Sequence, residues 1–132
     1  MAVAIKMAHA ADPRQEIREK LKGAEKNIRV MGARVLVATY IRPDKTASGI
    51  ILADRTREEE KHQGKTGMVI ALGPLAFQED DAHQWGDDKP TIGDWVMFNI
   101  GDTRRLIIGD AECRVLEDVA VQAVIASPDE IY

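Results

Sequence analysis

The chain has 132 residues, of which 45% are hydrophobic, so a single domain with one modest core is expected. Its net charge of -4 and the scattering of Lys and Arg among carboxylates argue against nucleic acid as a partner. The lone Cys113 excludes an intrachain disulfide framework, and no apolar run approaches the roughly 20 residues of a membrane span. We therefore expect a soluble, cytoplasmic protein with no secretory signal.

A short helix is the first element that the sequence predicts. Asp12 can accept hydrogen bonds from the exposed amides of a first turn, and Pro13 loses no hydrogen bond at the first helical position. Gln15 can reach back toward the helix start, and Gly23 favours a stop. The helix is therefore expected between Asp12 and Gly23.

The apolar stripe of this helix is narrow, because only Ile17 and Leu21 recur at helical spacing among charged residues. A helix of this length is marginal in water by itself. We expect residues 1–26 to be an N-terminal extension with a short surface helix, residues 27–126 a β-barrel domain, and residues 127–132 a C-terminal tail.

Short apolar and β-branched runs, separated by turns rich in Gly and Asp, follow from residue 27 onward. The expected strands are 34–40, 66–72, 94–98, 104–108, 113–116 and 119–125. With only two Phe, two Trp and two Tyr, the core must consist mainly of Val, Ile, Leu and Ala. These features predict an all-β fold, either a small barrel or a sandwich.

Two stretches, residues 41–65 and 78–90, are too polar to belong to a core and long for connections in a small domain. The first stretch carries three consecutive apolar residues, Ile50, Ile51 and Leu52. One interpretation is a short core strand on a long connection. The other is a docking tripeptide that stays exposed until it meets the groove of a partner, and periodicity alone does not decide between them.

A simple energy comparison shows what such a docking tripeptide can do. Burial of three aliphatic side chains contributes roughly 5–8 kcal/mol, whereas fixing about five loop residues costs roughly 5–10 kcal/mol of backbone entropy. One loop would therefore bind weakly, but several loops on one rigid ring turn the later contacts into intramolecular ones. The tripeptide thus makes functional sense in an oligomer and permits cycles of binding and release.

Several segments, taken in their order and spacing, resemble the GroES-type co-chaperonin family, whose members cap a large double-ring chaperonin. Gly49-Ile-Ile-Leu52 stands where the family carries its chaperonin-binding tripeptide, and Ile92-Gly-Asp-Trp-Val-Met-Phe98 resembles the hydrophobic-Gly-Asp segment that leads into a strand. The other matching segments are 27–29, 34–37, 60–65 and 68–73. The resemblance runs from Asn27 to about Ile125.

The resemblance implies a GroES-like irregular β-barrel, a ring that has seven subunits in this family, and binding to a GroEL-type chaperonin in its nucleotide-bound state. The implied chaperonin-binding residues are Gly49, Ile50, Ile51 and Leu52. The first and last strands pair between neighbouring subunits of the family, so the implied interface residues are Ile28, Val30, Val121, Val124 and Ile125. Pairing of this kind closes strand edges that otherwise invite aggregation.

The second polar stretch occupies the position of the family's roof hairpin, with the roof residues Glu79, Asp80, Asp81 and Trp85. Repeated around a ring, the carboxylates would make the roof opening electronegative. Trp85 would either pack under the hairpin or contact a neighbouring subunit. A cation held by Glu79, Asp80, Asp81 and His83 is a hypothesis, but a solvated polar hairpin is preferred, and we predict no metal site and no cofactor.

No convergent set of catalytic residues is recognisable, so we expect that the protein is not an enzyme. Cys113 lies within an apolar strand pattern and is interpreted as a packed core thiol. The main hypothesis is a co-chaperonin that assists protein folding, and the alternative is a structural or virion assembly protein that reuses the GroES-like barrel. Family members are also encoded by bacterial viruses, and the N-terminal extension and the charged loop would suit a bacteriophage protein.

Overall fold

The computed structural model of the chain describes residues 12–40, 66–80, 84–87 and 89–128. Its helix is α1 (Pro13–Leu21), and its strands are β1 (Arg34–Thr39), β2 (Thr66–Leu72), β3 (Trp95–Phe98), β4 (Thr103–Ile108), β5 (Ala111–Glu117) and β6 (Val121–Ile125). Short 3₁₀ turns occupy Ala24–Asn27, Ile100–Asp102 and Asp118–Ala120. None of the helices in the described ranges has the length and apolar character needed to cross a bilayer.

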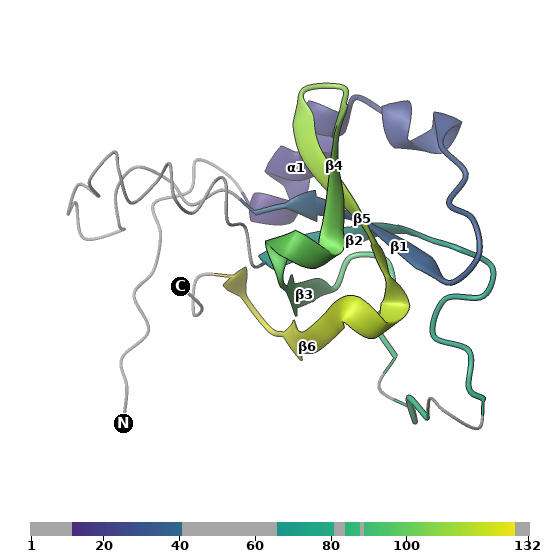
Figure 1. Cartoon of the computed structure of the whole chain (residues 1–132). Coiled ribbons are helices and arrows are strands. Elements are labelled where there is room, and N and C mark those ends of the chain that lie inside the picture. The colour runs from purple at the N-terminus through teal and green to yellow at the C-terminus, as the bar shows by residue number, and fades with distance from the viewer. Residues whose placement is uncertain (1–11, 41–65, 81–83, 88, 129–132) are drawn as a thin grey trace, which may run out of the picture.

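The six strands form one antiparallel sheet in the order β4-β5-β1-β2-β3-β6 (Figure 1). Two irregularities interrupt the pairing, one between Leu36 and Val37 of β1 and one between Met97 and Phe98 of β3. Such bulges bend a strand and increase its twist, which helps a small sheet to curve around its own apolar face. The predicted all-β fold with a short helix near the N-terminus is confirmed.

Both faces of β1 are buried, because its side chains enter two separate clusters. The helix-side cluster contains Ile17, Leu21, Val30, Leu36, Ala38, Met68, Trp95, Ile108, Ala111 and Cys113. The opposite cluster contains Val35, Val37, Val69, Phe77, Val96, Phe98 and Leu116. A strand covered on both sides has no solvated face, which explains why residues 34–39 form a nearly continuous apolar run rather than a strict alternation.

The start of α1 follows the sequence prediction. The Asp12 carboxylate accepts a hydrogen bond from the Arg14 amide at 2.8 Å, and Pro13 occupies the first helical position. The helix ends at Leu21, and the next residue, Lys22, adopts a left-handed conformation that turns the chain away. The helix therefore begins at residues whose chemistry favours a helix start, and it ends just before two left-handed residues, Lys22 and the predicted stop Gly23.

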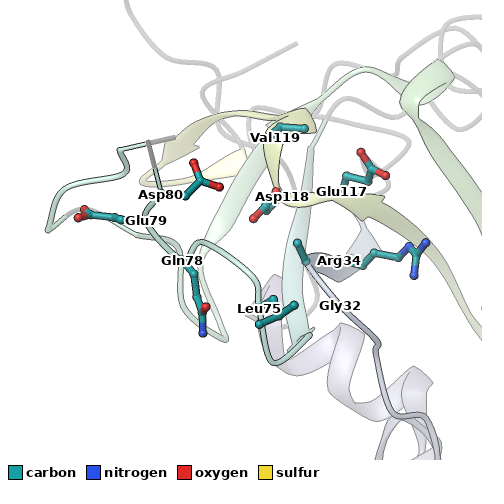
Figure 2. A pocket seen from close by; sticks show the side chains of 10 residues that line it. Gly32, Arg34, Leu75, Gln78, Glu79, Asp80, Glu117, Asp118 and Val119 are labelled. Carbon is teal, nitrogen blue, oxygen red and sulfur yellow. The ribbon is translucent and has the colours of Figure 1, made fainter. Parts of the chain in front are cut away.

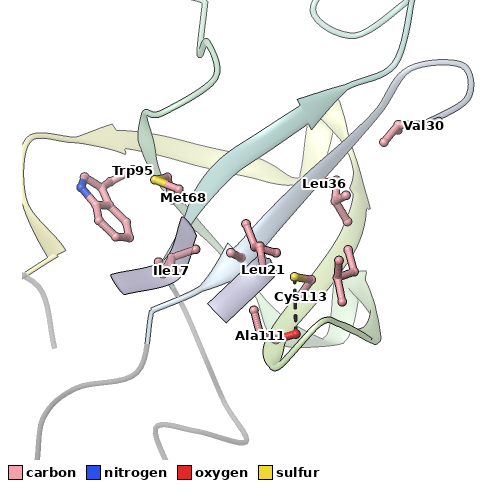
Figure 3. Packing of buried hydrophobic residues seen from close by; sticks show 10 residues of the cluster. Ile17, Leu21, Val30, Leu36, Met68, Trp95, Ala111 and Cys113 are labelled. Atoms are coloured by element: carbon pink, nitrogen blue, oxygen red, sulfur yellow. Dashed lines mark hydrogen bonds between the residues drawn. The ribbon is translucent and has the colours of Figure 1, made fainter. Parts of the chain in front are cut away.

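The predicted surface helix α1 packs its narrow apolar stripe against one face of the sheet, and the other residues of α1 stay exposed or half-buried. Ile17 and Leu21 are buried, and only 1% of Leu21 is exposed to solvent. Figure 3 shows both side chains among Leu36, Met68 and other members of the helix-side cluster. Burial of two aliphatic side chains contributes roughly 3–6 kcal/mol, which stabilises a helix that is marginal in isolation.

The turn between β4 and β5 lies directly under the C-terminal end of α1. The Asp110 amide donates a hydrogen bond to the Lys20 carbonyl at 2.8 Å. Gly109 precedes it with φ of 59°, and a Cβ at this position would lie 2.6 Å from the carbonyl oxygens of Lys20 and Leu21. Only glycine gives the turn both the backbone conformation and the space that this contact requires.

We predict that Gly109→Ala destabilises the protein more than Gly32→Ala does. Both residues have positive φ, 59° and 63°, so both substitutions introduce backbone strain of about 1–2 kcal/mol. A Cβ at Gly32 meets nothing within 4 Å, whereas at Gly109 it meets the helix backbone. The free energy of unfolding in urea should fall by about 1–3 kcal/mol more for Gly109→Ala. Equal losses in the free energy of unfolding would show that α1 is not in close contact with this turn in solution.

Cys113 is a core thiol, as predicted. It is fully buried in the helix-side cluster, and its Sγ lies 3.7 Å from the Ala111 carbonyl oxygen (Figure 3). Burial raises the pKa of the Cys113 thiol to about 12, and the nearby Glu112 and Glu25 carboxylates act in the same direction. The thiol is therefore kept protonated and shielded from reagents in the native state.

This raised pKa predicts a loss of stability at alkaline pH. The unfolded chain releases the thiol proton above about 9 and the folded chain only near 12, so rising pH favours the unfolded state across that window. The stability advantage of the wild type over Cys113→Ala should therefore shrink from pH 9 toward pH 12. A constant difference, or rapid labelling of the native thiol at pH 8, would contradict the buried, protonated state.

Candidate functional site

The segment that carries the predicted tripeptide connects β1 to β2. Gly49, Ile50, Ile51 and Leu52 lie outside the described residues, but both ends of the segment are described. The Tyr40 amide donates to the Thr66 carbonyl at 3.0 Å, next to the last paired residues of β1 and β2. The chain thus leaves the sheet and returns to it at neighbouring points, and we call Tyr40 and Thr66 the loop root.

The loop root is held by an aromatic and cationic contact. The Tyr40 ring meets the Trp95 ring edge to face, with centroids 5.7 Å apart and planes at 80°. The Arg14 guanidinium of α1 lies 5.5 Å from the centroid of the Trp95 ring, and its Nε donates to the Gly93 carbonyl at 2.7 Å. Trp95 is therefore contacted by α1 on one side and by the loop root on another.

A small cavity of about 50 Å³ lies between α1 and the ends of β1 and β5. Its lining includes Thr39 and Glu112, whose Oγ1 and Oε2 atoms are buried without a hydrogen-bond partner. The other carboxylate oxygen of Glu112 accepts from Arg105 at 2.7 Å and from Arg114 at 3.4 Å. Two guanidinium groups thus already neutralise Glu112, and the described ranges contain no cluster of acidic, His or Cys side chains suited to a metal ion.

The predicted interface residues of the last strand lie at an edge of the sheet. β6 pairs with β3 on one side, and no other described strand pairs with it. Val121 and Ile125 are half-buried and pack against the two core clusters, whereas Val124 is 48% exposed. β6 therefore presents an edge that no described strand covers, together with an apolar side chain, a combination that favours pairing with another strand.

The other predicted interface residues, Ile28 and Val30, precede β1 and pair with no strand of the described sheet. Val30 is buried in the helix-side cluster, and Ile28 is half-buried against it. An apolar groove of about 580 Å³ runs between this segment and the end of β2. Met31, which the sequence analysis did not select, also lines this groove and is 55% exposed.

The described part of the roof segment consists of turns around Trp85 rather than paired strands. The Trp85 ring meets the Phe77 ring edge to face at 5.1 Å, and its Nε1 donates to the Gln78 carbonyl at 3.2 Å. The Glu79 carboxylate accepts from the Gly86 amide at 2.9 Å. Trp85 therefore packs within its own subunit, and a contact with a neighbouring subunit stays a prediction.

An open acidic cleft of about 530 Å³ lies beside this roof segment (Figure 2). Glu79, Asp80, Glu117 and Asp118 line it, with Arg34 as the basic residue of the lining. The predicted roof residue Asp81 and the candidate ligand His83 lie outside the described residues.

Asp118 is a structural residue that the sequence analysis missed. Its buried carboxylate accepts from the Phe77 amide at 2.9 Å, and its own amide donates to the Ala33 carbonyl at 2.9 Å. These bonds join the roof segment, the end of β5 and the turn before β1. The only sequence signal was a pair of acids, Glu117 and Asp118, between two apolar strand patterns.

Comparison with known proteins gives a consistent result. The chaperonin 10 Kd subunit family matches residues 27–125. The co-chaperonin GroES of Halothermothrix orenii is 32% identical over 99 residues, which cover 75% of this chain and 97% of that protein.

Two further relatives agree with this match. The co-chaperonins GroES of Solidesulfovibrio magneticus and Polynucleobacter necessarius are 31% and 28% identical over 99 residues each. These alignments cover 74% and 75% of this chain, and 96% and 97% of the two relatives. The matched region contains every strand of the sheet, whereas α1 lies before it. The chain therefore belongs to the chaperonin 10 Kd subunit family, the family of the GroES co-chaperonins.

Proposed function

We propose that this chain is a co-chaperonin, whose copies form a seven-membered ring that caps a GroEL-type chaperonin in its nucleotide-bound state. The observation that carries the proposal is the family match over residues 27–125, together with relatives named co-chaperonin GroES. The capped chamber would let a client chain fold in isolation. Nucleotide hydrolysis then belongs to the partner, and this chain is not an enzyme.

We infer that the segment between β1 and β2 makes the contact with the chaperonin, through Gly49, Ile50, Ile51 and Leu52. The hydrogen bond between Tyr40 and Thr66 supports this inference, because it fixes both ends of the segment to adjacent strands. Every subunit of a ring would then offer its tripeptide from an equivalent place. Weak single contacts become an adequate total affinity under these conditions.

We infer further that β6 of one subunit pairs with residues 28–30 of its neighbour. The free edge of β6 and the apolar groove beside Ile28 and Met31 support this inference, because they are two different surfaces of one chain. Contacts between unlike surfaces repeat from copy to copy, and they close into a ring when the rotation allows. A cytoplasmic location completes the proposal, since the lone Cys113 fits a reducing compartment.

Replacing Ile50, Ile51 and Leu52 together by Ser should abolish capping while leaving ring assembly intact. The substitution removes roughly 5–8 kcal/mol of apolar burial per loop at most. Capping is measured by nucleotide-dependent co-sedimentation with a GroEL-type chaperonin, and assembly by native mass spectrometry.

Leu75→Ser is the matched control, because Leu75 is an exposed apolar residue beyond the far end of β2 from the loop root. It should cap as the wild type does. If the triple Ser variant also caps normally, the tripeptide assignment is wrong. Recovery of the wild type in virus particles and not with a chaperonin would favour the structural alternative.

Val124→Glu should convert the ring into smaller species. The exposed β6 side chain would become a charge buried in each subunit contact, at a cost of roughly 2 kcal/mol or more per contact. Analytical ultracentrifugation measures the change. Val119→Glu is the control, because Val119 is equally exposed at 48% but precedes the strand. An intact Val124→Glu ring would disprove the β6 interface.

A further inference from the structure

Helix α1 lies outside the family match, which begins at residue 27, yet it contacts the part of the sheet from which the loop leaves. Arg14, Ile17 and Leu21 recur at helical spacing and therefore share one face of α1. Ile17 and Leu21 are buried in the helix-side cluster. Their burial fixes the helix on the sheet and thereby determines where Arg14 lies.

We propose that α1 is a positioning element for the chaperonin-binding loop, and that Arg14 acts through Trp95 on the loop root. This inference rests on the proposed function. It assigns to the N-terminal extension a role in the affinity for the chaperonin rather than in the barrel alone.

The chain of contacts from the helix to the loop root is short. The Arg14 guanidinium lies against the Trp95 ring, and its bond to the Gly93 carbonyl fixes the direction of the side chain. Trp95 is only 2% exposed, so its ring has little freedom to move. The Trp95 ring in turn supports Tyr40, the last described residue before the loop.

When Tyr40 is held in place, the direction in which the chain leaves the sheet is fixed. A loop whose root is already ordered loses less conformational entropy when it binds a partner. The bond between the Tyr40 amide and the Thr66 carbonyl transmits the restriction to the returning end of the loop. Arg14 is therefore a positioning residue, and it need not touch the chaperonin.

The test compares Arg14→Ala with Arg18→Ala, which removes the same type of side chain one helical turn further along α1, where the side chain is exposed. In the isolated full-length protein, the Tyr40 amide of Arg14→Ala should exchange its hydrogen about two- to fivefold faster, as expected for loss of a cation–π contact. The Kd of the ring for a GroEL-type chaperonin with nucleotide should rise at least tenfold, because all loops weaken together. Arg18→Ala should change neither quantity.

Two rescue variants separate positioning from general destabilisation. Arg14→Lys keeps a cation near Trp95 and should recover part of the affinity, while Tyr40→Phe keeps the ring contact and should bind nearly as the wild type does. Tyr40→Ala should match Arg14→Ala, and the double variant should be no weaker than either one. This pattern is not expected if the substitutions merely loosen the fold.

The experiment distinguishes failure of this inference from failure of the proposed function. Failure of the wild type to bind a chaperonin would overturn the proposed function, and the inference that rests on it would fall as well. Normal wild-type binding with unchanged Tyr40 exchange in Arg14→Ala would overturn the inference alone. Equal losses of affinity in Arg14→Ala and Arg18→Ala would also overturn it, because they would indicate a general effect of charge on the helix.

Discussion

The burial of β1 on both faces is the constraint on which the rest of the structure depends. A strand without a solvated side needs an apolar cover above and below it. One cover is the opposite cluster around Val35 and Val37, and the other is the helix-side cluster around Leu36 and Ala38. Because the six-stranded sheet supplies only part of the second cover, α1 completes it, and this helix becomes part of the folded unit.

The same packing separates two ends of the sheet. At one end, Tyr40 and Thr66 close the connection between β1 and β2, with α1 and Trp95 beside them. At the other end, β2 leads into the roof segment, where Asp118 fixes the Phe77 amide beside an acidic cleft. The sheet therefore holds the loop root and the acidic cleft at opposite ends of the molecule.

The local chemistry of the sequence made many features of the fold predictable. The apolar runs gave the strands to within about two residues, Asp12 and Pro13 marked the start of α1, and Cys113 was recognised as a core residue. These features depend on each residue and its close neighbours in sequence, so a pattern is sufficient to find them. The order of the motifs also identified the family, which the comparison with known proteins then established.

The sequence by itself determined the strands, the helix boundaries and the family, because backbone preferences and apolar spacing are local properties. Tertiary structure alone decided that Ile17 and Leu21 enter the core, that Arg14 reaches Trp95, and that a buried Asp118 joins the roof segment to the sheet. Each of these contacts joins residues far apart in the chain, and the hydrogen bond from Arg14 to Gly93 beside them spans 79 positions. Their partners are chosen by the curvature and register of the folded sheet, which no local pattern encodes.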